Sequence, residues 1–283
     1  DELTLDFAKA LIDNEQLGQD AVPDYLAVSF SSTDYVGHMF GASSLESEDN
    51  LARLDRTLAA LFRHVDEKVG LENTLIVLSA DHGQPEIPGH LRELGIAHAR
   101  HFDTDALDKT PAIAALKERF GIAEELIEAF FQPYVYLNRE LIRAKGLDQA
   151  EVEKVVAEEL VKFDGVAAAV SSTALRTASL PDTLLMRSIL RNFHQKRSGD
   201  IYLVFEPNVF INDFDGLTVA STHGSPWRYD TYVPVMFAGA GLQPRTVTRA
   251  VTPDDIAPTL AARLGVKPPS GTIGNPLPEV LGD

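Results

Sequence analysis

The chain has 283 residues, of which 45% are hydrophobic, so it is long enough for one large domain or for one domain with an inserted lobe. Its formal charge of −17 argues against a basic surface that holds nucleic acid by its phosphates, and we therefore expect no nucleic-acid partner. The chain has no cysteine, which excludes disulfides, thiolate metal sites and cysteine nucleophiles. No apolar run approaches the length that spans a bilayer, and the given sequence opens on DELTLDF with neither an initiator Met nor a signal peptide.

The first 83 residues predict an alternation of helices and buried strands. A helix is expected over 3–17 and a strand over 23–30; a capped amphipathic helix then runs from about residue 45 to Gly70, and a second strand covers 73–78. Each strand leads into a short segment that holds an Asp and a His. This helix–strand–helix–strand order is typical of a parallel, doubly wound sheet.

From residue 84 the alternation changes, and the middle of the chain predicts a separate lobe. The expected elements are helices over 103–120, 123–131, 148–163 and 181–195, and strands over 133–137, 165–171 and 200–205. A buried strand over 232–238 and a helix over 252–264 follow. We therefore expect an α/β three-layer sandwich with a mostly parallel doubly wound sheet and an inserted β-α-β-α-β lobe. The expected boundaries are 1–130 for the first part of the core, 131–207 for the lobe and 208–283 for the last part of the core.

Five side chains stand out as candidate metal ligands: Asp34, His38, Asp81, His82 and His223. Carboxylate oxygen and imidazole nitrogen are the ligands of catalytic zinc sites and of sites for similar divalent ions. Asp34 and His38 are close enough in sequence to share one ion, and Asp81 and His82 suit another. An isolated Asp-His pair in a loop is usually part of a turn, but here three His-bearing segments each lie near glycine and beside a predicted strand.

Four segments together resemble the alkaline phosphatase superfamily: STDYVGH, LSADHG, THGSPWRYDTYVPVMFAG and TPDDIAPTLAARLG. The resemblance is strongest to monomeric bacterial alkaline phosphatases of the phosphate-irrepressible type and to the type I phosphodiesterase/nucleotide pyrophosphatase branch. It covers most of the chain and is weakest in the inserted lobe.

The resemblance implies a site with two zinc ions. Asp34, His38 and His223 match the ligands of the first ion, and Asp81 and His82 match two ligands of the second. The family's nucleophilic Thr or Ser, a further Asp and the residues that hold the phosphoryl group lie upstream in the family. We therefore expect the chain to correspond to the carboxyl-terminal portion of such an enzyme, with no catalytic nucleophile and no further cofactor site of its own.

The function implied by the resemblance is hydrolysis of small phosphate monoesters through a covalent phosphoryl-Thr or phosphoryl-Ser intermediate. The alternative on the same site is a phosphodiesterase or nucleotide pyrophosphatase. A different class of alternative is a domain that binds metal or phosphate without turnover. The resemblance also implies a periplasmic or secreted protein, without a membrane span, that acts as a monomer.

Overall fold

The computed structural model describes residues 1–214 and 217–282, and these fall into two compact units. The first unit comprises Asp1–Gly37, Ser43–Gly83 and the chain from Tyr232 onward; the second comprises His38–Ala42 and Gln84–Thr231. Within the described residues, no helix is both long and apolar enough to cross a membrane.

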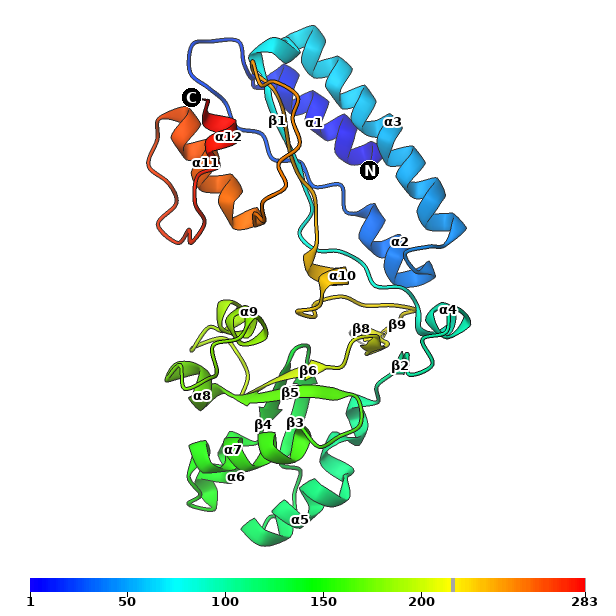
Figure 1. Cartoon of the computed structure of the whole chain (residues 1–283), viewed down its shortest axis with the longest axis vertical. Helices are drawn as coiled ribbons and strands as arrows, with labels where there is room; N and C mark the ends of the chain where they lie inside the picture. Colours follow the sequence, from blue (N-terminus) through cyan, green and yellow to red (C-terminus); the bar gives the residue numbers. More distant parts are fainter. Residues whose placement is uncertain (215–216, 283) are drawn as a thin grey trace. The chain divides into compact units, whose positions relative to one another are not determined.

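The first unit contains two long helices, a two-stranded ribbon and a helical carboxyl-terminal region (Figure 1). Its elements are α1 (Glu2–Asn14), α3 (Leu45–Lys68), a 3-10 turn (Leu71–Asn73), β1 (Leu75–Ser79), β10 (Val235–Gly239), a second 3-10 turn (Pro253–Asp255), α11 (Ile256–Leu264) and α12 (Pro278–Leu281). Helix α2 (Ser32–Phe40) begins in this unit and ends in the second.

Helix α3 forms where the sequence predicts it. The hydroxyl of Ser44 accepts a hydrogen bond from the backbone N–H of Ser47 at 3.1 Å and so caps the amino-terminal end of the helix. Leu61 of α3 packs with Leu5, Ala8 and Ile12 of α1 in a small apolar cluster, and Figure 1 shows the two helices side by side.

The second unit is built on a four-stranded sheet with helices on both faces. Its elements are α4 (Pro88–Glu93), β2 (Arg100–His101), a 3-10 helix (Thr104–Lys109), α5 (Pro111–Phe120), β3 (Ile127–Phe131), β4 (Tyr134–Leu137), α6 (Arg139–Ala144), α7 (Gln149–Leu160), β5 (Val166–Ser171), α8 (Ser172–Arg176), α9 (Leu184–Asn192), β6 (Ile201–Phe205), β7 (Val209–Phe210), β8 (Asp213–Phe214), β9 (Leu217–Thr218) and α10 (Arg228–Thr231). The strand order is β3-β4-β6-β5, and every described pairing in this sheet is antiparallel.

Alternate residues of strand β6 contribute to two apolar clusters, one on each face of this sheet. Ile201, Leu203 and Phe205 point into the larger apolar cluster, with residues of α5, α6 and α7. Tyr202 and Val204 point to the opposite face, where α8 and α9 cover them. This alternation follows from the two-residue period of a strand.

The mixed α/β class is confirmed, but the strand directions differ from those expected. Strand β1 pairs antiparallel with β10, and among the described residues the parallel pairing is the short β2–β7 contact. The segment 23–30 has extended backbone without strand pairing in the described part of the chain. Sequence periodicity reports which residues are apolar, whereas strand direction depends on partners far away along the chain.

The helix expected over 123–131 is wrong, because Ile127–Phe131 is strand β3. It forms a hairpin with β4 around Gln132 and Pro133. The apolar residues of this segment are too few to separate a strand from a helix by period alone. The lobe boundaries expected from the sequence stay a prediction.

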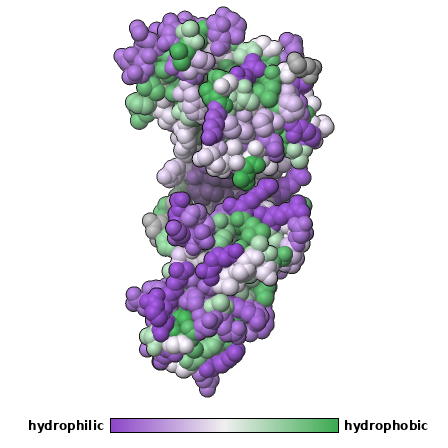
Figure 2. All heavy atoms as spheres, turned by 90° about the vertical axis from the view of Figure 1, so that its left-hand side faces the viewer, coloured by the Kyte–Doolittle hydropathy of each residue, from purple (hydrophilic) through white to green (hydrophobic). Residues whose placement is uncertain are grey.

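Apolar side chains also reach the surface. Figure 2 shows several green hydrophobic patches set among purple hydrophilic side chains. Large exposed hydrophobic residues in the first unit include Phe7, Tyr25 and Met236. Strand β1, which the sequence predicts to be buried on both faces, is only half-buried in its apolar run.

Candidate metal centre

Helix α2 carries two of the candidate ligands on one face. Asp34 and His38 are four residues apart, which places their side chains one above the other along the helix. The hydroxyl of Thr33, beside Asp34, accepts a hydrogen bond from Asn50 of α3 at 2.8 Å. Thr33 is therefore engaged in a contact that ties the start of α2 to α3.

His38 is buried, and its orientation is fixed by the segment that leads to His223. The ring Nδ1 lies 2.8 Å from the carbonyl oxygen of Ser221, and the carbonyl of His38 accepts a hydrogen bond from the backbone N–H of Ala220 at 2.8 Å. Because a carbonyl oxygen only accepts, Nδ1 must carry the proton. The other ring nitrogen, Nε2, then has its lone pair available for a cation.

His223 follows on the same segment and is also held through its backbone. Its carbonyl oxygen accepts a hydrogen bond from the side-chain amide of Gln132 at 2.8 Å. Gly224 has a φ of +102°, which L side chains rarely adopt, and a Cβ there would approach the amide of Gln132. Glycine is therefore the residue that best fits the backbone just after His223.

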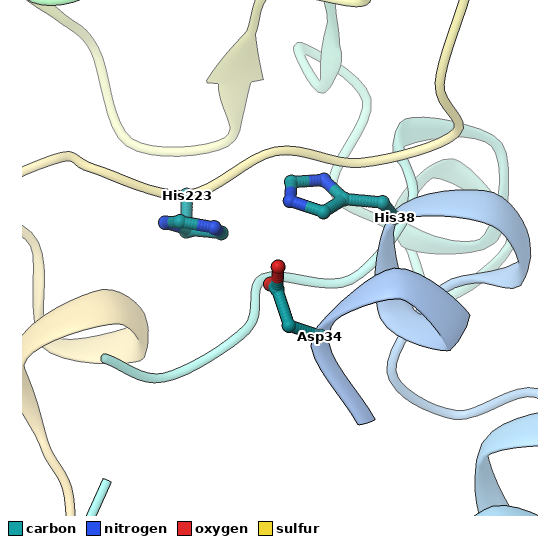
Figure 3. Close-up of side chains that lie close together, drawn as sticks. All are labelled: Asp34, His38 and His223. Atoms are coloured by element: carbon teal, nitrogen blue, oxygen red, sulfur yellow. The ribbon is translucent and has the colours of Figure 1, made fainter. Parts of the chain in front are cut away.

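The carboxylate of Asp34 and the rings of His38 and His223 face one another (Figure 3). One ligand atom from each residue lies within 4.8 Å of the other two, and the two imidazole centroids are 4.9 Å apart. Two donors bound to the same zinc ion at about 2.1 Å can be no more than about 4.2 Å apart. The separations in this cluster are therefore of the size that a zinc site requires, and its set of one carboxylate and two imidazoles fits a catalytic zinc ion.

Asp81 and His82 follow β1, and His82 lies close to both Asp34 and Asp81. The Nε2 atom of His82 lies 3.7 Å from Oδ1 of Asp34 and 3.6 Å from Oδ2 of Asp81. The Nδ1 atom of His82 lies 2.9 Å from the carbonyl oxygen of Gly83, which again leaves Nε2 as the available donor. The Asp81 side chain is 90% exposed.

The structure thus brings three predicted ligands into one group and places the other two next to it. Asp34, His38 and His223 form the group, His82 neighbours Asp34, and Asp81 neighbours His82. Whether all five bind metal stays a prediction.

Two residues that support the candidate site are not apparent from the sequence. Gln132 and Ser221 act through hydrogen bonds to or from backbone carbonyls, and their partners lie 91 and 183 residues away along the chain. No local motif marks either residue. A pair of histidines that does look like a metal motif, His98 and His101, instead contacts backbone carbonyls of Pro207 and Ala220.

Comparison with known proteins agrees with the family resemblance found in the sequence. The sequence profile of the family described as type I phosphodiesterase/nucleotide pyrophosphatase matches residues 2–226. The chain is 36% identical over 282 residues to alkaline phosphatase PafA of Elizabethkingia meningoseptica, with 99% of this chain and 50% of that protein covered. It is 40% identical over 281 residues to a protein of Myroides odoratus named a calcium-transporting ATPase, again with 99% and 50% covered.

The fold is also similar to a solved structure. A crystal structure of wild-type alkaline phosphatase PafA matches with a TM-score of 0.87 and 35% identity, over 99% of this chain and 52% of that one. The chain therefore spans about half the length of the curated relatives it matches.

Proposed function

The chain belongs to the type I phosphodiesterase/nucleotide pyrophosphatase family, and from this premise we propose that it provides metal ligands for the hydrolysis of small phosphate monoesters. The observation that carries the proposal is the convergence of Asp34, His38 and His223 on one point. Similarity to alkaline phosphatases over nearly the whole chain supports the choice of monoesters.

The proposed cofactor is a pair of zinc ions. Asp34, His38 and His223 would hold one ion, and Asp81 with His82 would supply part of the coordination of the second. Bound zinc would supply positive charge for the phosphoryl oxygens and lower the pKa of an attacking hydroxyl. An enzyme chain with a net charge of −17 needs such a source of positive charge to attract an anionic substrate.

The chain's own residues would act by holding the metal-binding nitrogen and oxygen atoms in position. The contact of His38 with the Ser221 carbonyl keeps Nδ1 protonated and so makes Nε2 the nitrogen that would bind the metal. The hydrogen bond from Gln132 keeps the His223 segment in place. Pre-positioned donors reduce the reorganisation that a metal would otherwise have to drive.

The nucleophile is proposed to be a Thr or Ser hydroxyl outside the 283-residue chain, because the matched relatives are about twice as long. The phosphoryl group would pass from the ester oxygen to this hydroxyl, and the alcohol would leave with a proton. Water would then hydrolyse the phosphoryl-enzyme and release inorganic phosphate. A small phosphate ester is the only partner that this scheme requires.

The runner-up is hydrolysis of phosphodiesters or nucleotide pyrophosphates at the same site, and the family's own description favours it. The ratio of rates on p-nitrophenyl phosphate and bis-p-nitrophenyl phosphate, measured on the whole enzyme that contains this chain, separates the two. A faster monoester reaction supports the proposal, and a faster diester reaction overturns the choice of substrate.

The ligand assignment has its own test. His223→Ala in the whole enzyme should remove about one equivalent of zinc and lower monoesterase activity by more than about 100-fold. His98→Ala is the matched control, because this exposed histidine lies on the same unit and outside the metal cluster. Full zinc content and activity in His223→Ala would refute the assignment.

A non-catalytic role is the alternative of another class. Zinc-loaded whole protein that binds phosphate but releases none from any ester would establish it. The candidate cluster does not suit calcium, because calcium prefers oxygen ligands and the cluster contains two imidazoles.

We also propose a periplasmic or secreted, monomeric enzyme. The support is the similarity to bacterial alkaline phosphatases along nearly the whole chain. Cell fractionation and gel filtration with light scattering test the two statements separately. Activity confined to the cytosolic fraction would overturn the first, and a mass of twice the protomer would overturn the second.

A further inference from the structure

The second unit contains a solvent-open cavity of about 320 Å³ that involves none of the five candidate metal ligands. Its lining residues come from helices α6, α7 and α8 and from the segment that follows α9. Figure 1 labels these helices in the lobe built on the four-stranded sheet. The volume of the cavity is within the range of small-molecule sites. Its walls combine guanidinium, amide and hydroxyl groups with a smaller apolar part: Arg139, Ile142, Arg143, Leu147, Gln149, Glu153, Ser172, Arg176, Phe193, Gln195 and Ser198.

Three arginines line this cavity. Arg139 and Arg143 are four residues apart on α6 and so lie on the same side of that helix, and Arg176 ends α8. The guanidinium of Arg139 is bound to the carboxylate of Asp200 at 2.7 Å, and that of Arg176 donates to the hydroxyl of Thr173 at 2.8 Å. Within the described residues, the guanidinium of Arg143 makes no hydrogen bond or ion pair.

The buried carboxylate on the cavity wall, that of Glu153, does not form an ion pair with Arg143 or Arg176. Glu153 is 2% exposed, and its oxygens accept hydrogen bonds from neutral donors: the hydroxyl of Ser172 at 3.0 Å, the backbone N–H and hydroxyl of Thr173 at 3.0 and 2.9 Å, and the amide of Gln149 at 3.2 Å. A buried carboxylate with this many donors is satisfied without a cation. Two arginine side chains therefore face the cavity without a carboxylate that pairs with them.

The grouping of cations is confined to this cavity. A second hollow of about 440 Å³ shares Arg139 and Ser198 with the first, but its cations Arg139, Lys196 and Arg197 are matched by the carboxylates of Glu128, Glu140 and Asp200. The whole chain has 25 basic residues against 42 acidic ones, so a grouping of cations is contrary to its average composition. A local positive field of this kind attracts anions even in an acidic protein.

We propose that the cavity lined by Arg139, Arg143 and Arg176 binds a small oxyanion of the phosphate class that carries an apolar substituent. Guanidinium groups match the oxygens of phosphate in two-pronged hydrogen bonds. Arg139 is already paired with Asp200, but the guanidinium groups of Arg143 and Arg176 have no carboxylate partner in the described part of the chain and outweigh the one carboxylate on the wall. The amides of Gln149 and Gln195 supply further donors, and the apolar side chains of Leu147 and Phe193 provide the surface for the substituent. The proposal does not depend on the metal centre.

The experiment measures binding of inorganic phosphate and of phenyl phosphate to the 283-residue chain after chelator treatment, by ³¹P NMR and calorimetry at low ionic strength. We expect saturable binding of both, tighter for phenyl phosphate. Arg143→Gln and Arg176→Gln should each weaken it by about tenfold or more, since each removes a charged hydrogen-bond donor. Both positions are exposed, and circular dichroism would verify that the variants stay folded.

Two control variants make the result specific. Arg187→Gln removes an exposed arginine of α9 that is paired with Asp182 and does not line the cavity, and binding should not change. His223→Ala disturbs the candidate metal centre and should also leave binding unchanged. Three outcomes would overturn the proposal. The first is binding that persists when both Arg143→Gln and Arg176→Gln are present, and the second is loss of binding in His223→Ala. The third is binding that does not saturate below about 10 mM phosphate.

Discussion

Replacing Gln132 with Ala tests whether support from the lobe matters to the candidate metal centre. The side chain of Gln132 lies in the turn between β3 and β4, and its amide donates to the carbonyl of His223 at 2.8 Å. The change removes one neutral, partly buried hydrogen bond, whose net value is about 0.5–1.5 kcal/mol. If the lost free energy is all taken from the metal-bound state, the zinc affinity of the site falls by about 2- to 12-fold.

The assay is competition for zinc between the purified chain and a chromogenic chelator, with the melting temperature measured in parallel. Gln19→Ala is the matched control, because the Gln19 amide also donates to a backbone carbonyl, that of Lys68, in the first unit. Gln132→Ala should weaken zinc binding while Gln19→Ala does not. Equal zinc affinity in the two variants would show that the hydrogen bond to His223 does not position a ligand.

Three further predictions follow from burial, from charge and from the proposed cofactor. Leu160 lies in the core of the lobe at 0% exposure, so Leu160→Ala should lower the free energy of unfolding by about 2–5 kcal/mol. Leu51 is 53% exposed on α3, so Leu51→Ala should change it by less than about 0.5 kcal/mol. Equal losses for the two variants in urea titrations would contradict this prediction. Hydrogen bonds from Arg249 lower the pKa of Glu279 to about 2, so the pair stabilises the fold above pH 4.5 and loses this contribution as pH falls toward 2. The carboxyl carbon resonance of Glu279 should titrate near pH 2 and shift to higher pH in Arg249→Gln, and an unchanged midpoint would remove the Arg249 bond as the cause. Chelation should abolish hydrolysis by the whole enzyme and added zinc should restore it; activity that persists without metal would exclude the proposed cofactor.

Local signals in the sequence predict most of the longer helices, miss short ones such as α2 and predict the strand pairings poorly. Helix α3 has a serine cap, an apolar face and a glycine at its end, and all three act within a few residues. The segment 23–30 has the composition of a buried strand, and Leu26, Val28 and Phe30 do pack beside α1 and α3. Its alternate side chains stay exposed, because no strand is paired with it among the described residues. Pairing is a long-range property that apolar runs do not encode.

The candidate site could also be predicted only in part from the sequence. The sequence predicts only that Asp34 and His38 are close enough along the chain to share one ion. The structure adds helix α2, which the sequence did not predict and on which residues four apart share a face. His223 is far from them along the chain, and its assignment depended on the repeated pattern of His-bearing segments and on the family resemblance. The structure adds what neither source contains: the Ser221 carbonyl that sets the tautomer of His38 and the Gln132 amide that holds the His223 segment. These contacts involve backbone atoms, so side-chain motifs cannot report them.

This acidic chain has two proposed anion-binding locations, one at the metal ligands and one in the arginine-lined cavity. Removal of the metal distinguishes them. At the group formed by Asp34, His38 and His223, the side chains are neutral or negative at pH 7 when the imidazoles are unprotonated, so a phosphate group is attracted there only through a bound cation. In the lobe cavity, Arg143 and Arg176 carry their positive charge permanently. Chelation should therefore eliminate phosphate binding at the first location and leave it intact at the second. A single phosphate per chain that disappears with the metal would mean that the arginine cavity is only a solvated surface, whereas a phosphate retained without metal and lost with the arginines would place a second anion site in the lobe.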